Sequence, residues 1–125
     1  MHRSRLACFV IDCRTDDLSR DTEFWSGALG MPVRVAPEGT PPYADLQSPA
    51  GEPRMLLQQV EHESRIHLDI ETDDLEAEVK RLEALGAKRI GFVKRWWVME
   101  APSGHRFCVV NPQRPDFPAG ATEWP

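Results

Sequence analysis

The feature that most limits the fold of this chain is an internal repeat. Thr-Asp-Asp-Leu occurs at residues 15–18 and again at 72–75, and Ala-Leu-Gly occurs at 28–30 and again at 84–86. In both copies an apolar run precedes the acidic pair, and the glycine ends a stretch of helical length. This order is typical of a strand, an acidic helix start, a helix and a glycine stop. The chain is therefore predicted to be a duplication with the same elements in each half.

Each predicted helix is followed by segments that read as short strands. They are residues 33–36, 43–47 and 55–60 in the first half, and 88–93, 96–100 and 107–110 in the second. In the second helix, Asp73 is the predicted N-cap with Glu76 three residues on, and Gly86 is the predicted stop. Strand, helix and three strands, occurring twice, predict an α+β fold with its helices outside the sheets. A rival βαββαβ fold would need only four strands.

Composition and charge favour one domain with a small ligand. The chain has 125 residues, 41% of them hydrophobic, and a formal net charge of -5. This length suits one globular domain spanning residues 1–125. No basic run exceeds two residues, which argues against a surface for nucleic acid or for an anionic membrane. The expected partner is a small molecule.

The N-terminal apolar run and the cysteines favour a reducing compartment. Leu6–Ile11 is too short for a signal-peptide core or a membrane span. Three cysteines are an odd number, and each is read first as a small buried hydrophobe. We therefore expect a cytoplasmic protein without disulfides.

The predicted strand over residues 65–71 alternates between apolar and polar side chains. Ile66, Leu68 and Ile70 share one face, and we expect that face to lie under the second helix. The other face carries His67, Asp69 and Glu71. Whether this polar face meets bulk water or a cleft decides the role of His67.

Three segments carry a family resemblance. They are FWSGALGMPV at 24–33, HLDIETDDLEAEVKRLEALGAK at 67–88 and APSGHRFCVV at 101–110. Together they resemble the glyoxalase, bleomycin-resistance and extradiol-dioxygenase superfamily, also called vicinal oxygen chelate proteins. The resemblance covers residues 5–112 and implies two tandem βαβββ modules, at about 5–60 and 64–112, whose sheets curl around a cleft. It also implies frequent dimers, but not one particular reaction.

The resemblance implies a metal ligand at His67, but the rest of the ligand set is incomplete. The repeat pairs His67 with Val10, which cannot bind a metal, and Cys8 lies two residues earlier on the same face. The family's closing glutamate corresponds to Cys108, and the matching strand of the first half offers Gln58. A soft zinc site of His67, Cys108 and Cys8 is one alternative. His67 is the best single metal candidate.

Other side chains are candidates for catalysis or ligand binding. Asp12 and Asp69 occupy equivalent points of the two halves and could face each other, or each could pair with a neighbouring base. Glu100 is a third candidate base. Trp96 and Trp97 are consecutive on a predicted strand, so one should face the helix layer and the other the opposite side.

Three functions stay open on this reading. The first is a glyoxalase-like protein that binds a small organic molecule without a complete metal site. The second is a metal-dependent lyase, isomerase or dioxygenase with an unusual ligand set, and the third is a non-catalytic interaction domain. The proline-rich tail, residues 113–125, should form an extended strap anchored by Phe117 or Trp124. We expect a homodimer, with the tail lying on the second copy.

Overall fold

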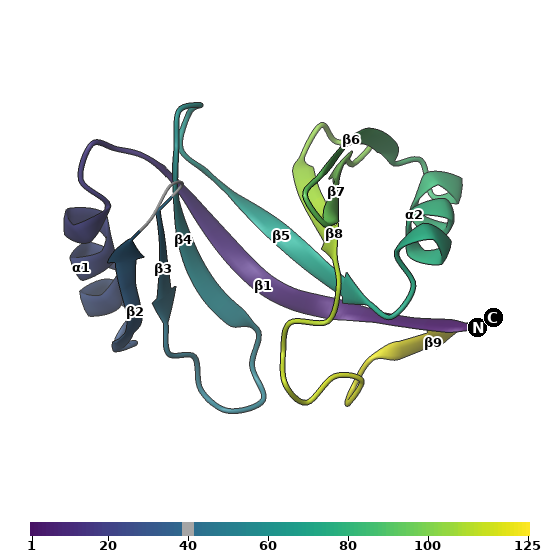
Figure 1. Cartoon of the computed structure of the whole chain (residues 1–125), viewed down its shortest axis with the longest axis horizontal. Helices are drawn as coiled ribbons and strands as arrows, with labels where there is room; N and C mark the ends of the chain where they lie inside the picture. The colour runs from purple at the N-terminus through teal and green to yellow at the C-terminus, as the bar shows by residue number, and fades with distance from the viewer. Residues whose placement is uncertain (39–41) are drawn as a thin grey trace. The chain divides into compact units, whose positions relative to one another are not determined.

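The structure is a computed structural model that describes residues 1–38 and 42–125. The described residues form a mixed α+β protein with two helices and nine strands (Figure 1). In chain order the elements are β1 (His2–Arg14), α1 (Leu18–Leu29), β2 (Val33–Glu38), β3 (Tyr43–Leu46), β4 (Arg54–Val60), β5 (Arg65–Thr72), α2 (Leu75–Ala84), β6 (Lys88–Val93), β7 (Trp96–Glu100), β8 (Arg106–Val110) and β9 (Thr122–Trp124). This confirms the predicted α+β class with its repeated strand, helix and three strands.

The chain divides into two compact units. The first unit is residues 8–66, and the second unit combines residues 1–7 with 67–125. In the first unit the strand order is β2, β3, β4, β1, and β1 runs parallel to β4. Helix α1 packs on these strands, and its core contains Ile11, Leu18, Leu46 and Leu57.

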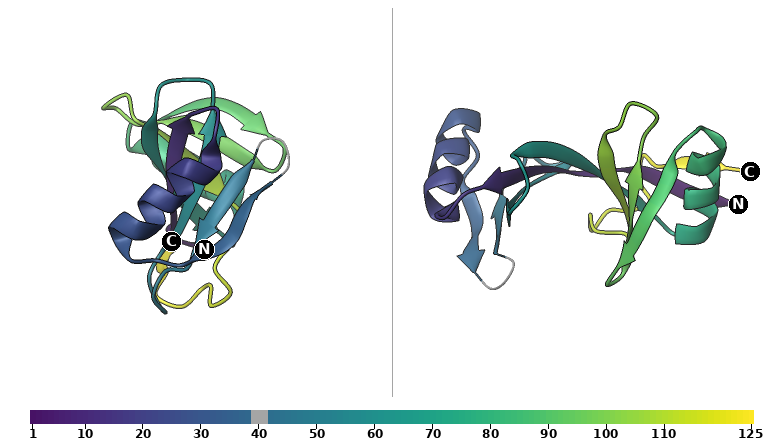
Figure 2. Two further views of the ribbon diagram at one scale, coloured as in Figure 1. Left: turned by 90° about the vertical axis from the view of Figure 1, so that its left-hand side faces the viewer. Right: turned by 90° about the horizontal axis from the view of Figure 1, so that it is seen from above.

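The second unit repeats this plan. Strand β5 runs parallel to β8, and β7 and β6 follow as antiparallel neighbours. Helix α2 lies beside β6, β7 and β8 (Figure 2). The core under α2 consists of Val79, Leu82, Met99 and Val109. In each unit the first and last strands are parallel neighbours. A βαβββ module requires this arrangement, because parallel neighbours need a long crossover connection between them, here formed by the helix and two strands.

The second helix begins one residue later than predicted. Asp74, not Asp73, is the N-cap, and its carboxylate accepts from the backbone N–H of Ala77. The Asp73 carboxylate instead accepts from the backbone N–H of Arg3. Because the Asp73 carboxylate binds the backbone of β1, it does not cap α2. The prediction of Asp73 as the N-cap is therefore wrong.

The apolar face of β5 is only partly covered. Ile70 packs against the core under α2, but Ile66 is 57% exposed and Leu68 is 40% exposed. The expectation that all three lie under the helix is therefore wrong for Ile66 and Leu68. Alternation set the face correctly, but α2 contacts β6, β7 and β8 and does not reach that end of β5.

The C-terminal tail lies along its own chain. Strand β9 pairs antiparallel with the beginning of β1, so the two termini are close together (Figures 1 and 2). Trp124 donates from Nε1 to Ser4 Oγ, and the Arg81 guanidinium lies over its ring. The Arg5 guanidinium lies over the ring of Phe117. Both tail aromatics thus contact residues of the same chain.

Two further findings bear on the setting of the chain. None of the described helices is long and apolar enough to span a membrane. None of the three cysteines, all within the described residues, forms a disulfide: Cys8 and Cys13 are buried, and Cys108 is half-buried. The prediction of a small buried side chain is therefore confirmed for Cys8 and Cys13.

Candidate functional site

The polar face of β5 in the second unit continues across β8 and β7. Asp69 is the direct neighbour of Cys108 on β8, and Cys108 is the neighbour of Val98 on β7. Ile70 and Val109 belong to the core on the helix side. Because strand side chains alternate, Asp69, Cys108 and Val98 lie in a row on the face away from α2. His67 precedes Asp69 by two residues on the same face.

His67, Asp69 and Cys108 converge on this face. One nitrogen of His67, one carboxylate oxygen of Asp69 and the Cys108 sulfur all lie within 4.8 Å of one another. His67 Nε2 is 3.3 Å from Asp69 Oδ1. Asp69 is only 7% exposed, and its Oδ1 atom accepts no hydrogen bond within the described part of the chain. Oδ1 is thus within ion-pair distance of His67 without hydrogen-bond geometry, and a cation or a hydrogen-bond donor held among the three groups would satisfy it better.

The two tryptophans have different surroundings. Trp97 packs against the core under α2, with its ring in edge contact with Phe92 and beneath the Arg89 guanidinium. Trp96 therefore points to the polar face, level with Val110 and beyond Cys108. The prediction that one tryptophan faces the helix layer is confirmed, and that residue is Trp97. Trp97 therefore serves to pack the core. Trp96 is the tryptophan that is left as a candidate for contact with a ligand.

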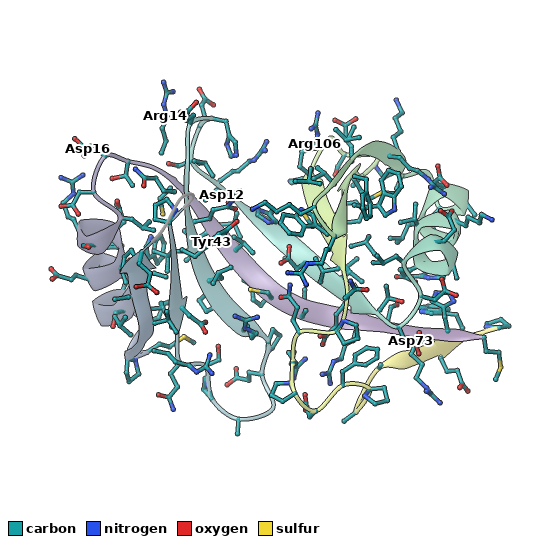
Figure 3. All side chains as sticks on the ribbon, viewed as in Figure 1. Asp12, Arg14, Asp16, Tyr43, Asp73 and Arg106 are labelled. Carbon is teal, nitrogen blue, oxygen red and sulfur yellow. The ribbon has the colours of Figure 1, made fainter. Side chains whose placement is uncertain are left out.

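Glu100 lies at the other end of the same face. It is the neighbour of Arg106 on β8, and Arg106 donates from Nε to Glu100 Oε1 at 3.1 Å. Arg106 is labelled in Figure 3. The Glu100 carboxylate is thus held by a guanidinium at the edge of the face, two residues along β7 from Val98, which is level with Cys108.

The first unit carries a second polar row. Asp12 on β1 is the neighbour of Gln58 on β4, which is in turn the neighbour of Tyr43 on β3. Gln58 donates from Nε2 to the Tyr43 hydroxyl at 3.3 Å, and Asp12 and Tyr43 are labelled in Figure 3. Asp12 stands beside Gln58 as Asp69 stands beside Cys108. Gln58 and Cys108 therefore occupy equivalent positions in the two units.

Asp12 is buried beside two basic groups. Its Oδ2 atom lies 3.9 Å from Arg65 Nε and 4.0 Å from His62 Nε2. Pairing of Asp12 with Arg65 was one of the alternatives that the sequence left open. His62 and Tyr43 were not among the predicted site residues, because a histidine in a linker and an isolated tyrosine carry no distinctive pattern.

An open depression also lies at the end of β1, lined by Arg14, Thr15, Asp16, Arg20, Asp21, Val60 and Glu61.

The residues present can hold a metal, although not in the combination expected. The predicted soft set named Cys8 as the third ligand, but the group that comes together in the described residues contains Asp69 in its place. Val10 is buried and offers no ligand atom. Imidazole, carboxylate and thiolate are all zinc ligands, and three protein ligands leave one position open. The oxygen of Asp69 that lacks a donor is the observation that favours this fit.

Comparison of sequences gives one match. A family model described as "Glyoxalase-like domain" matches residues 8–110. No curated protein sequence matches the chain significantly.

Solved structures with a similar fold include three of different kinds. Methylmalonyl-CoA epimerase from Mycobacterium tuberculosis is 20% identical, with a TM-score of 0.63 over 87% of this chain and 88% of that one. A glyoxalase/bleomycin resistance protein/dioxygenase superfamily member from Vibrio splendidus 12B01 is 15% identical, with a TM-score of 0.55 over 85% and 98%. An extradiol ring-cleaving dioxygenase from B. fuscum is 18% identical, with a TM-score of 0.58 over 95% of this chain and 34% of that one. At these identities the likeness concerns the fold alone.

Proposed function

This chain belongs to the glyoxalase-like domain family, and we propose that it binds a small organic molecule on the polar face of β5 and β8 in its second unit. The observation that carries the proposal is the convergence of His67, Asp69 and Cys108 within 4.8 Å. These groups supply a donor or acceptor nitrogen, a buried carboxylate and a polarisable sulfur. Trp96 on the same face adds apolar area, which is the usual make-up of a small-molecule site.

The carboxylate of Asp69 defines the ligand chemistry that the site accepts. Because the 3.3 Å contact of its Oδ1 atom with His67 Nε2 lacks hydrogen-bond geometry, a ligand hydroxyl, amine or amide N–H could satisfy this oxygen. A hydrogen bond to a charged carboxylate contributes about 1.5–3 kcal/mol. We therefore expect ligands with a hydrogen-bond donor beside an aromatic or aliphatic group.

Chemical-shift mapping with a library of small hydroxyl- and amine-bearing fragments tests this proposal. Binding fragments should shift the backbone amides around His67, Asp69 and Cys108, and His67→Ala should weaken them by at least about tenfold, or 1.4 kcal/mol. His105→Ala, in the turn before β8, is the matched control and should bind as the wild type does. Fragment shifts that cluster elsewhere, or that survive His67→Ala unchanged, would refute the proposal.

A second candidate function is metal-dependent catalysis of the lyase, isomerase or dioxygenase type. The oxygen of Asp69 that lacks a donor is the observation in its favour. His67, Asp69 and Cys108 would hold the ion, which would polarise a carbonyl or hydroxyl oxygen of the substrate when bound. A thiolate in the ligand set favours zinc over the harder cations.

Elemental analysis of protein purified without a histidine tag tests the metal. If the three side chains bind zinc, incubation with zinc followed by desalting should leave close to one zinc per chain, and separate incubations with nickel and with iron test the other ions. Cys108→Ser and His67→Ala should lose it, whereas Cys13→Ser and His105→Ala should retain it. Metal-free wild-type protein after all three incubations would remove this second function and leave the first.

We also propose that the chain is a homodimer. Strands β2 and β6 are edge strands that expose apolar side chains, namely Val33 and Val35 on β2 and Ile90, Phe92 and Val93 on β6. Exposed apolar edges favour association. Light scattering should give twice the chain mass, and Phe92→Lys should reduce it, whereas Phe24→Lys on the exposed face of α1 should not. A monomeric wild-type protein would refute the dimer.

A further inference from the structure

The C-terminal segment crosses the polar face of the second unit beside the candidate site. We call residues 111–119 the strap. Strand β8 ends at Val110, next to Glu71 on β5. The backbone N–H groups of Gln113 and Arg114 both donate to Glu71 Oε1, at 2.6 and 2.9 Å. Glu71 follows Asp69 by two residues on the same face, about 7 Å along β5, so the strap is held next to the candidate site.

Burial shows that the strap covers this end of the face. Glu71 is 0% exposed and Val110 is 4% exposed, although both point away from the face that α2 covers. His67 and Cys108, farther from the strap, are only half-buried. The polar face is thus closed where the strap crosses it and more open beyond Asp69.

Arg5 fixes the far side of the strap. Its Nε donates to Glu71 Oε2 at 2.6 Å, and its Nη2 donates to Asp116 Oδ1 at 2.8 Å. It also donates to the backbone carbonyl of Ala119 and lies over the ring of Phe117. The hydrogen bond from Arg5 holds the pKa of Asp116 below its usual range. One carboxylate and one guanidinium therefore fix five separate points of the strap.

We propose that the strap is one wall of the ligand site and that Glu71 is the residue that positions it. This inference rests on the proposed binding function, because it assigns the boundary of the same site. The wall stands at the Glu71 end of β5, so the length of a ligand that contacts Asp69 is limited in that direction along the strand. Glu71 contacts the strap and not the ligand. It therefore acts through the backbone that it holds.

Glu71→Gln tests the wall through two readouts that need no ligand. The amide would place an N–H against the Arg5 donor, which weakens the anchor. Hydrogen exchange of peptides covering residues 111–119 should accelerate by about tenfold or more, since hydrogen bonds to a charged group are lost. Labelling of Cys108 by a bulky maleimide should accelerate by at least about fivefold relative to labelling by small methyl methanethiosulfonate. Glu123→Gln, which removes the exposed ion pair with Arg3, is the matched control.

The outcomes separate the wall from the binding function. Faster exchange with an unchanged ratio of bulky to small reagent would show that the strap opens away from the site, and would overturn the proposal. Unchanged exchange would remove the positioning role of Glu71. Should Glu71→Gln fail to fold, Arg114→Ala serves in its place. It keeps Glu71 but removes the 3.1 Å bond from the Arg114 side chain to the Leu6 carbonyl and the charge beside Asp116. Fragment mapping that fails while both readouts change would remove the binding function and leave the strap as a cover over Cys108.

Discussion

Replacing Glu78 by Gln should destabilise the protein in a manner that depends on pH. Glu78 on α2 is 0% exposed. Arg81 donates to it twice, at 2.9 and 2.7 Å, and His2 Nε2 lies 2.7 Å from its Oε1 atom. Burial alone would raise the pKa of Glu78, but the hydrogen bonds from Arg81, His2 and Ser4 and the charge of Arg81 outweigh it, so the pKa is lowered.

The size of the effect follows from the contacts that the substitution weakens. Removing one partner of a buried ion pair costs about 3–5 kcal/mol. Arg81 keeps part of its surface in water, and glutamine keeps one acceptor oxygen, so we expect the free energy of unfolding to fall by about 2–3 kcal/mol at pH 7. The exposed acceptor Glu83, changed to Gln, should cost less than about 1 kcal/mol as the matched control.

The pH dependence has a definite sign. Because the pKa of Glu78 is lower in the folded chain than its ordinary value of 4.5, the unfolded chain takes up the proton first as pH falls. The stabilisation is therefore complete above about pH 4.5 and is lost as pH drops through the lower folded value. Urea unfolding of wild type and Glu78→Gln from pH 7 to pH 3 should show their difference shrinking below pH 4.5. A difference below 0.5 kcal/mol at pH 7, or one that stays constant to pH 3, would refute this reasoning.

Four other perturbations have expected outcomes. Gly86 has φ of +109°, and a Cβ there would lie 3.1 Å from Pro102 Cγ, so Gly86→Ala should lower the midpoint of urea unfolding. Gly27→Ala, inside α1 with open space around it, should raise that midpoint by removing about 0.5–1 kcal/mol of helix-disfavouring entropy. Asp74→Ala removes the N-cap of α2 and should cost about 1 kcal/mol in the same assay. Burial, with nearby carboxylates, raises the pKa of Cys13 to about 11. The free energy of unfolding of the wild type should therefore fall as pH rises from the ordinary thiol value of 9.0 to about 11. Cys13→Ala should lose less stability over the same range.

The local pattern of the sequence was enough to predict most elements of the fold. The repeat located both helices, and alternation in β5 placed His67 and Asp69 on one face. The N-cap was misplaced by one residue because the backbone of Arg3, far away in the chain, uses the Asp73 carboxylate. A local capping rule contains no information about such a contact.

The candidate site depended on strand register, which composition does not specify. Parallel pairing brings Asp69 beside Cys108, and no spacing in the sequence reveals that pairing. The soft site was therefore predicted with Cys8 in the place that Asp69 takes. The tail shows the same limit. Its prolines excluded a helix, but the arginines that hold its aromatics, Arg5 and Arg81, could be identified only from the fold.

The two carboxylates of β5 on this face, Asp69 and Glu71, allow a direct test of which one serves function. Glu71 accepts three hydrogen bonds, from Arg5 Nε and from the backbone of Gln113 and Arg114, so its charge stabilises the fold. Asp69 is also buried, but its Oδ1 atom meets His67 Nε2 at 3.3 Å without hydrogen-bond geometry, so its charge is less well compensated than that of Glu71. Natural proteins retain such a charge mainly where function requires it. Asp69→Asn should therefore leave the free energy of unfolding unchanged or raise it by up to about 1 kcal/mol, whereas Glu71→Gln should lower it by about 2 kcal/mol. Urea unfolding of the two variants gives the comparison. A loss above 1 kcal/mol for Asp69→Asn would make that carboxylate structural and withdraw the main support for the site.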